Sequence, residues 1–114
     1  MSTIFKKIID KEIKADIVYE DDFVMAFNDI SPVAPVHILI IPKVEISTLN
    51  KLEDNDAELM GKLVIAAKNI AKSKDISDDG YRLVFNCNEN GGQTVFHIHC
   101  HLIGGRILDW PPGW

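Results

Sequence analysis

The sequence predicts an α+β domain in which two helices pack on an antiparallel sheet of about five strands. Two segments have apolar residues at helical spacing, and five short segments between turn signals are rich in β-branched or aromatic residues. The connections between these segments are short, so neighbouring strands are expected to pair in antiparallel fashion. The 114 residues suffice for one domain but not for two. We therefore expect a single domain over residues 1–114, with a C-terminal tail from about residue 104.

The first half of the chain is expected to form one helix followed by three strands. Apolar residues at helical spacing, with Thr3 as a possible N-cap, predict the helix: Ile4, Phe5, Ile8, Ile9 and Ile13. Short segments on either side of an acidic turn predict strands over 17–20 and 23–27. Two prolines mark residues 28–35 as a loop, and the apolar run 36–41 is typical of a central strand.

The second half is expected to form one helix and two strands. Asp54 or Asn55 can cap a helix that extends to about Lys74, because its apolar residues share one stripe: Leu59, Leu63, Ala66, Ala67 and Ile70. A turn over 78–80 separates this helix from a strand over 81–87. A tight loop over 88–92 then leads to the last strand, over 95–103. Two prolines exclude a regular helix or an inner strand from residues 109–114.

The composition limits the possible partners. The 12 basic and 17 acidic residues give a net charge of −5, which argues against binding to a nucleic-acid backbone. No apolar run approaches the roughly 18 residues of a membrane span, and the charges near the N-terminus do not fit a secretory signal. Cys87 and Cys100 form no CxxC motif. We therefore expect reduced cysteines, a cytoplasmic location, and neither a nucleic-acid nor a membrane partner.

The chemistry is concentrated in the last expected strand, where His97, His99 and His101 occupy every second position. Because side chains alternate across a strand, the three imidazoles would share one face. The opposite, core face would take Phe96, Ile98, Cys100 and Leu102. Histidine can act as nucleophile, acid or base near neutral pH, and a partly cationic row would attract a phosphate. A buried His37 would need a partner, and the histidine row is the simplest one.

The glycine-rich loop before the row adds a second signal. Residues 91–94 (Gly-Gly-Gln-Thr) offer backbone N–H groups and a hydroxyl, which suit an anionic oxygen. The apolar, aromatic tail favours a homodimer in which a second copy covers it. Plainer interpretations stay open at this point. The row could bind zinc, His37 could be a core residue, Asp29 could be a turn residue, and Trp110 could serve only dimer packing.

The segment His97–Ile103 resembles the signature of the histidine triad superfamily, in which three histidines alternate with apolar residues. Further blocks, spread along nearly the whole chain, resemble the nucleotide-binding (Hint) branch of that superfamily: residues 3–5, 26–32, 37–43, 91–93 and 110–113.

This resemblance implies a dimeric α+β fold and an enzyme that hydrolyses purine nucleoside phosphoramidates, in which an amine is joined to the phosphate of AMP or GMP. His99 would attack the α-phosphorus and form a covalent nucleotidyl-histidine, which water then hydrolyses. His101 would bond the phosphate oxygens, and His37 would orient the row from behind. His97 would help to hold the tautomer of the nucleophile. The resemblance implies no metal and no other cofactor.

The resemblance also implies roles for residues outside the row. Thr94, which stands where this branch commonly has serine, would lie where the leaving amine needs a proton. Asp29 would accept the ribose hydroxyls, and Trp110 would approach the leaving-group side of the partner subunit's site. Contacts to the phosphate and leaving group are implied for Asn86, Gly92, Gln93 and Thr94. A pocket for the base and ribose is implied for Ile4, Phe5, Phe27, Asn28, Asp29 and Ile30.

Two other functions stay open. One is hydrolysis of dinucleoside polyphosphates, as in the fragile histidine triad branch; the other is a nucleotide-binding scaffold with little turnover. The tail block 110–113 and the early helix favour the phosphoramidase. Asn28 replaces a frequent histidine. Residues 87–90 are an unusual version of their loop, and Trp114 directly follows the 110–113 block. These last two departures bear on substrate selectivity rather than on the core chemistry.

Overall fold

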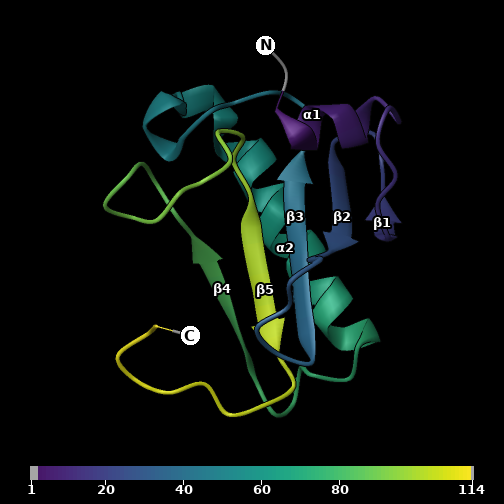
Figure 1. Ribbon diagram of the computed structural model, residues 1–114, viewed down its shortest axis with the longest axis vertical. Helices are drawn as coiled ribbons and strands as arrows, with labels where there is room; N and C mark the ends of the chain where they lie inside the picture. The colour runs from purple at the N-terminus through teal and green to yellow at the C-terminus, as the bar shows by residue number, and fades with distance from the viewer. Residues whose placement is uncertain (1–2, 114) are drawn as a thin grey trace.

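A computed structural model describes residues 3–113, so Trp114, the last residue of the expected tail, lies outside the described residues together with Met1 and Ser2. The elements follow the expected order (Figure 1): α1 (Ile4–Ile9), β1 (Ile17–Glu20), β2 (Val24–Asn28), β3 (Val36–Pro42), α2 (Ala57–Ser73), β4 (Tyr81–Phe85) and β5 (Cys100–Gly104). The strands form one antiparallel sheet in the order β1-β2-β3-β5-β4. The predicted α+β fold class is therefore confirmed.

The helix α2 covers one face of the sheet and lies behind it in Figure 1. It buries a single stripe of residues: Leu63, Ala66, Ala67, Ile70 and Ala71. These pack on side chains from three strands: Val24, Ala26, Ile38, Ile40, Cys100 and Leu102. The helix follows a short 3-10 turn, η2 (Asp54–Asp56), in which Glu53 and Asp56 form a capping box. Burial of this apolar stripe is the main force that holds α2 on the sheet.

The helix α1 covers part of the opposite face. Side chains alternate along a strand, so the residues of β2 and β3 that point away from α2 form a second core with Phe5 and Ile8. These strand residues are Met25, Phe27, Leu39 and Ile41. Leu39 pairs with His101 across β3 and β5. The α1 face of the two central strands therefore carries His37 and His101 beside the second core.

The first helix is shorter than the sequence predicted. Thr3 caps α1 as expected, because its hydroxyl accepts a hydrogen bond from the backbone N–H of Lys6 at 3.2 Å. The helix nevertheless ends at Ile9, and Lys11 adopts a positive φ of 62°, which an α-helix does not allow. Ile13 therefore lies outside the helix.

The last strand is also shorter than predicted, and this difference affects the site. β5 begins at Cys100, so His97 and His99 precede the strand. The backbone N–H of Ile98 bonds the carbonyl of Ile46 in a loop at 2.8 Å, instead of joining a strand ladder. Phe96 was expected in the core, but its side chain is 47% exposed. The alternation rule fails here because residues 95–99 are not held in a sheet.

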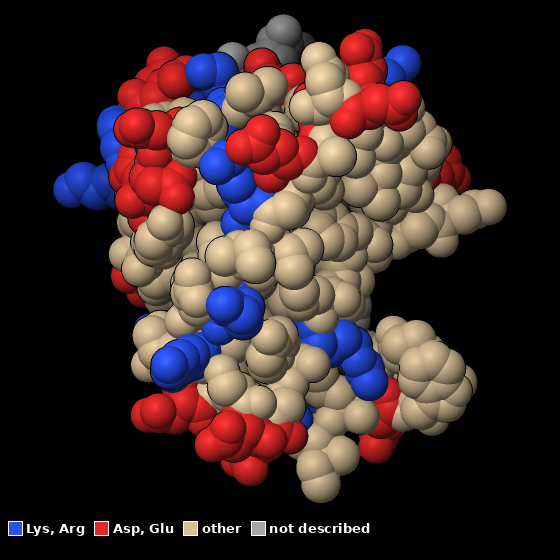
Figure 2. All heavy atoms as spheres, turned by 180° about the vertical axis from the view of Figure 1, so that it is seen from behind, with Lys and Arg blue, Asp and Glu red and all other residues tan. Residues whose placement is uncertain are grey.

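The surface carries charges of both signs. Figure 2 shows acidic and basic side chains interspersed on the face seen from behind, in keeping with the modest net charge of −5. Among residues 3–113, we find no helix with the length and apolar character needed to cross a bilayer.

Candidate active site

A cavity of about 740 Å³ opens on the α1 face of the sheet. This volume lies within the roughly 300–1,000 Å³ that is typical of small-molecule sites. Its apolar walls come from α1, the segment after it, the central strands, the loop before β3 and the segment before β5: Ile4, Phe5, Ile8, Ile13, Ala15, Phe27, Ile30, Leu39 and Val95. Thr94, His99 and His101 supply polar groups to the same cavity. The cavity thus combines an apolar wall with nucleophilic and hydrogen-bonding groups.

The hydrogen bonds of His99 define its tautomer. Its Nδ1 atom lies 2.8 Å from the carbonyl oxygen of His97, which can only accept. Nδ1 therefore carries the proton, and the neutral ring keeps its lone pair on Nε2. The ring of Phe5 packs edge-on against the imidazole, with centroids 5.0 Å apart. The side chain of His99 is held in one orientation, with a nucleophilic nitrogen available to the cavity that it lines.

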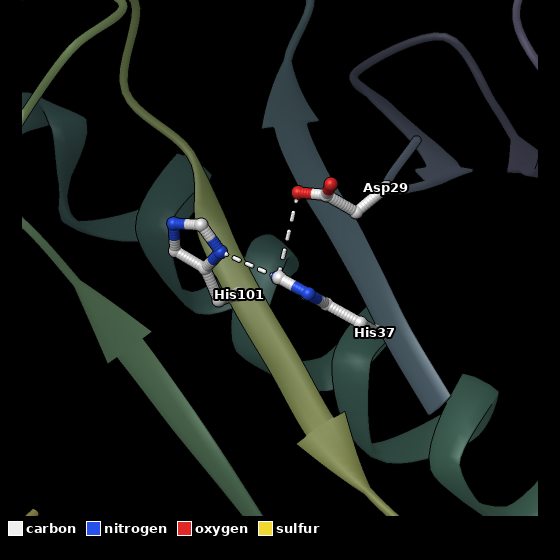
Figure 3. A group of neighbouring side chains, drawn as sticks. All are labelled: Asp29, His37 and His101. Carbon is white, nitrogen blue, oxygen red and sulfur yellow. Dashed lines mark hydrogen bonds and ion pairs between the residues drawn. The ribbon is translucent and has the colours of Figure 1, made fainter. Parts of the chain in front are cut away.

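His37 and His101 form a chain of hydrogen bonds with one possible direction (Figure 3). The backbone N–H of Val33 donates to Nδ1 of His37 at 3.2 Å, so the proton of the neutral His37 ring resides on Nε2. Nε2 lies 2.9 Å from Nδ1 of His101 and 3.5 Å from a carboxylate oxygen of Asp29. Nδ1 of His101 must therefore accept, and its own proton is on Nε2. The chain prepares His101 as a hydrogen-bond donor.

Burial keeps this row of imidazoles neutral near pH 7. Desolvation is the main cause that lowers the pKa of His37, His97 and His99 below the usual value of 6.5. Desolvation, together with the charges of His99 and His37, lowers the pKa of His101 to about 4. The 3.5 Å contact between Nε2 of His37 and the Asp29 carboxylate is therefore a polar contact of a neutral ring rather than an ion pair. A partly cationic row, which the sequence led us to expect, is not supported.

The segment that carries His99 is braced by side chains rather than by a strand ladder. His97 is fully buried, and its Nε2 donates to the carbonyl of Pro42 at 2.8 Å. Gln93 is 6% exposed, and its amide nitrogen donates to the carbonyls of Ser47 at 2.8 Å and Val95 at 3.0 Å. Its amide oxygen accepts from the backbone N–H of Asn88 at 2.8 Å. These bonds tie the segment to two neighbouring loops.

The loop before this segment is closed by its own contacts. Asn86 donates from its side-chain amide to the carbonyl of Gly91 at 2.7 Å. A side chain at position 91 would meet the backbone of Cys87, and Gly92 has a φ of 82°, so both positions favour glycine. These contacts fix the conformation of the loop that leads to Thr94 and the cavity.

The structure brings most of the expected site residues to one cavity. Nine of them line it: Ile4, Phe5, Phe27, Asn28, Asp29, Ile30, Thr94, His99 and His101. Six lie outside its lining: His37, Asn86, Gly92, Gln93, His97 and Trp110. His37 bonds Nδ1 of His101, and the carbonyl of His97 accepts from Nδ1 of His99. The amide of Gln93 bonds Ser47, Val95 and Asn88. Trp110 is 82% exposed on the tail.

The sequence interpretation missed several residues of the cavity. Ile8 and Ile13 were predicted only as members of the first helix, and Leu39 only as part of a central strand, yet all three line the cavity. Lys14 and Asp16 also line the cavity. They lie in the connection between α1 and β1, where no periodic pattern distinguishes a pocket residue from a solvent-exposed one.

Comparison with known proteins agrees with this geometry. The sequence model of the HIT domain family matches residues 10–108. The chain belongs to the HIT family. It is 54% identical over 106 residues to the purine nucleoside phosphoramidase of Escherichia coli strain K12, covering 93% of this chain and 89% of that protein. The crystal structure of a HIT family hydrolase from Legionella pneumophila superposes with a TM-score of 0.97 at 52% identity, covering 98% and 100% of the chains. These relatives support membership of this chain in the Hint branch of the HIT family.

A relative from Brassica juncea is named a 14 kDa zinc-binding protein, with 52% identity over 113 residues, 97% of this chain and 99% of that protein. Among the described residues, Asp29, His37 and His101 offer ligand atoms within 4.8 Å of one another. We therefore ask whether these three side chains could bind a metal ion. A metal on Nε2 of His37 would require the proton on Nδ1, where the N–H of Val33 already donates. This hydrogen-bonded arrangement therefore does not fit a metal ion.

Proposed function

We propose that this HIT protein hydrolyses purine nucleoside phosphoramidates through a covalent nucleotidyl-histidine formed on His99. One observation carries the proposal. His99 donates from Nδ1 to the carbonyl of His97, which leaves a lone pair on Nε2 in a ring that lines a nucleotide-sized cavity. The similarity to a purine nucleoside phosphoramidase over most of the chain supports the same reaction.

In the first step, Nε2 of His99 attacks the α-phosphorus, and the bond between phosphorus and the amine nitrogen breaks. The amine takes up a proton and leaves. The nucleotidyl-histidine carries a positive charge, which the carbonyl of His97 stabilises through Nδ1–H. In the second step, water attacks phosphorus, the bond to Nε2 breaks, and a nucleoside monophosphate leaves. Two moderate barriers replace one high barrier.

The protonated Nε2 of His101 donates to a non-bridging phosphate oxygen in this scheme. That donor stabilises the charge that develops on the phosphoryl group. The hydroxyl of Thr94, which lines the cavity, delivers the proton that the leaving amine requires, and the water that attacks in the second step returns a proton to this oxygen. Asn86 and the backbone of Gly92 support the phosphate side by holding the loop that precedes Thr94.

The rest of the cavity receives the nucleoside. The carboxylate of Asp29 accepts the ribose hydroxyls, while its Oδ1 atom is oriented by the backbone N–H of Ser31 at 2.7 Å. The base lies among apolar side chains, which include the ring pair of Phe5 and Phe27 with centroids 5.5 Å apart. AMP, GMP and their amine conjugates are therefore the ligands to test.

The active form is a homodimer in this proposal. β4 is an edge strand whose five residues are all only partly buried. On the tail, Ile107 is 88% exposed and Trp110 is 82% exposed. A second copy would cover this apolar tail, and Trp110 would reach the leaving-group side of the partner subunit's site. Light scattering in solution measures the mass, and a monomer at micromolar concentration would refute this part.

The cellular location of the protein stays a prediction. Cys87 and Cys100 are both free thiols, and burial raises the pKa of Cys100 to about 12, so that thiol is unreactive. Free cysteines fit the reducing cytoplasm that the sequence predicts. The expectation of neither a nucleic-acid nor a membrane partner rests on the same sequence argument.

The test is to trap the intermediate. The protein is mixed with an adenosine phosphoramidate, quenched within milliseconds in base, where phosphohistidine survives, and examined by peptide mass spectrometry. We expect a nucleotidyl group on the peptide that contains His99, and none in the His99→Gln variant. A nucleotidyl group on another residue, or turnover without any adduct in the variant, would refute the proposal.

A further inference from the structure

The cavity has a polar rim far from the catalytic histidines. His101 lies on β5, whereas Asp16 directly precedes β1, and β1 is separated from β5 by β2 and β3. Strands lie about 4.8 Å apart, so three spacings put roughly 14 Å between these positions. Lys14 and Asp16 line the same cavity as His101. A nucleotide whose phosphate contacts the histidines would therefore extend its base toward Lys14 and Asp16.

The carboxylate at this rim has a defined orientation. The side-chain amide of Asn28 donates to Oδ2 of Asp16 at 2.8 Å, and the backbone N–H of Asn28 donates to the carbonyl of Asp16 at 3.0 Å. Asn28 follows Phe27, which forms part of the apolar wall. The rim thus combines the Asp16 carboxylate, whose Oδ2 atom is held by Asn28, with the side chain of Lys14, in the same cavity as the apolar wall against which a base would stack.

This pairing of an acceptor and a donor distinguishes the two purines. Guanine presents two donors, N1–H and the 2-amino group, next to an acceptor, O6. Two donors side by side match a carboxylate, and O6 matches an ammonium group. Adenine presents an acceptor, N1, and a donor, the 6-amino group, at the corresponding places. Adenine would therefore set N1 against the carboxylate and its amino group against the lysine.

Resting on the function proposed above, we propose that Lys14 and Asp16 make this site selective for guanine nucleotides over adenine nucleotides. Asp16 would accept from N1–H and the 2-amino group, and Lys14 would donate to O6. The side chains are at the solvent-exposed rim, so water competes with both contacts and the preference is moderate.

Equilibrium binding of GMP, IMP and AMP tests this proposal without any need for turnover. IMP keeps N1–H and O6 but lacks the 2-amino group. We expect GMP to bind about tenfold more tightly than AMP, with IMP between them. Equal affinity for the three nucleotides, or tighter binding of AMP, would overturn the proposal.

Two variants assign the contacts. Asp16→Asn keeps one oxygen for Asn28 but loses the second acceptor, so the gap between GMP and IMP should close. Lys14→Met should narrow the gap between IMP and AMP. Asp22→Asn, an exposed carboxylate in the turn after β1, is the matched control and should keep the order of affinities. If Asp16→Asn weakens GMP and AMP by the same factor, Asp16 only supports the wall and the proposal is wrong.

The outcomes also separate this inference from the proposed function. If the three nucleotides bind in the expected order but phosphoramidates are not hydrolysed, the proposed reaction fails and the base preference stands. If phosphoramidates of adenosine and guanosine are hydrolysed with equal kcat/KM and their products bind equally, the reaction stands and the base preference fails.

Discussion

His101 and His99 are two residues apart, yet different parts of the fold hold them. His101 lies within β5 and pairs with Leu39 of β3, so the ladder of the central sheet positions it. His99 precedes β5, in a segment that three hydrogen bonds attach to the end of β3 and to the loop after it. The proposed donor, His101, is therefore part of the sheet, whereas the proposed nucleophile, His99, depends on a few hydrogen bonds outside it. Substitutions far from the phosphate can thus affect the nucleophile more than the donor.

The largest expected effect comes from the proposed nucleophile. If Nε2 of His99 attacks phosphorus as proposed, His99→Ala removes that atom, and kcat should fall about 10⁴-fold or more. The cavity walls remain, so AMP should still bind within about threefold of its original affinity. Steady-state kinetics and calorimetry measure both values. Turnover above a tenth of the original rate would contradict the role of His99.

Substitution of Gln93 tests whether its hydrogen bonds hold the segment that carries His99 in position. Gln93→Met keeps the length of the side chain but removes all three hydrogen bonds, so the segment with His99 should lose its fixed position. We expect kcat to fall about 10- to 100-fold while KM changes little, because the nucleoside walls are intact.

The control for Gln93 is Asn90→Met, an exposed residue of the same loop. It should leave kcat unchanged. A thermal unfolding curve of each variant distinguishes loss of position from loss of fold. If Gln93→Met instead raises KM with kcat constant, the amide contacts the nucleotide and the brace is not its main role.

The pH dependence of stability tests the burial of the row. The folded pKa of His101 is about 4, below the value of about 6.5 for the unfolded chain. As the pH falls through 6.5, His101 is protonated in the unfolded chain but stays neutral in the folded protein. The free energy of unfolding therefore decreases down to about pH 4.

Urea unfolding at pH 7 and pH 5 measures this loss, which the other three histidines increase because their pKa values are also lowered. His101→Asn should show a smaller loss of stability over the same range. An increase in stability on acidification to pH 5 would mean that the imidazoles are charged in the folded protein.

The smallest effect is expected at Thr94. Thr94→Ser keeps the hydroxyl and removes one methyl group, so kcat/KM should change by less than about threefold for small amines. Thr94→Val, which removes the hydroxyl at similar volume, should lower kcat much more. Equal rates for the valine and serine variants would show that the hydroxyl does not serve the leaving amine.

Much of this architecture could be predicted from the sequence, because it depends on local patterns. A continuous apolar run rich in β-branched residues, between prolines, located β3, and helical spacing located α2 to within a few residues. The partnership of buried His37 with the histidine row followed from the cost of an unpaired buried polar group, and the bond from His37 to His101 bears it out.

The features that the sequence did not predict depend mostly on contacts between residues far apart in the chain. The start of β5 was placed too early because the N–H of Ile98 bonds Ile46, far away in the sequence. The role of Gln93 depends on carbonyls at Ser47 and Val95, which no motif reveals. Asp16 enters the cavity only because β1 pairs with β2 and brings it beside Asn28. Such contacts exist only once the sheet has formed.

The most direct test of the account is the tautomeric state of the histidines, read from nitrogen-15 chemical shifts of the imidazoles at pH 7. We expect neutral rings throughout, with the proton on Nδ1 in His99 and on Nε2 in His37, His97 and His101. This pattern leaves a nucleophilic Nε2 on His99 beside a donor on His101. A cationic ring, or a His99 ring protonated on Nε2, would contradict the assignment of nucleophile and donor.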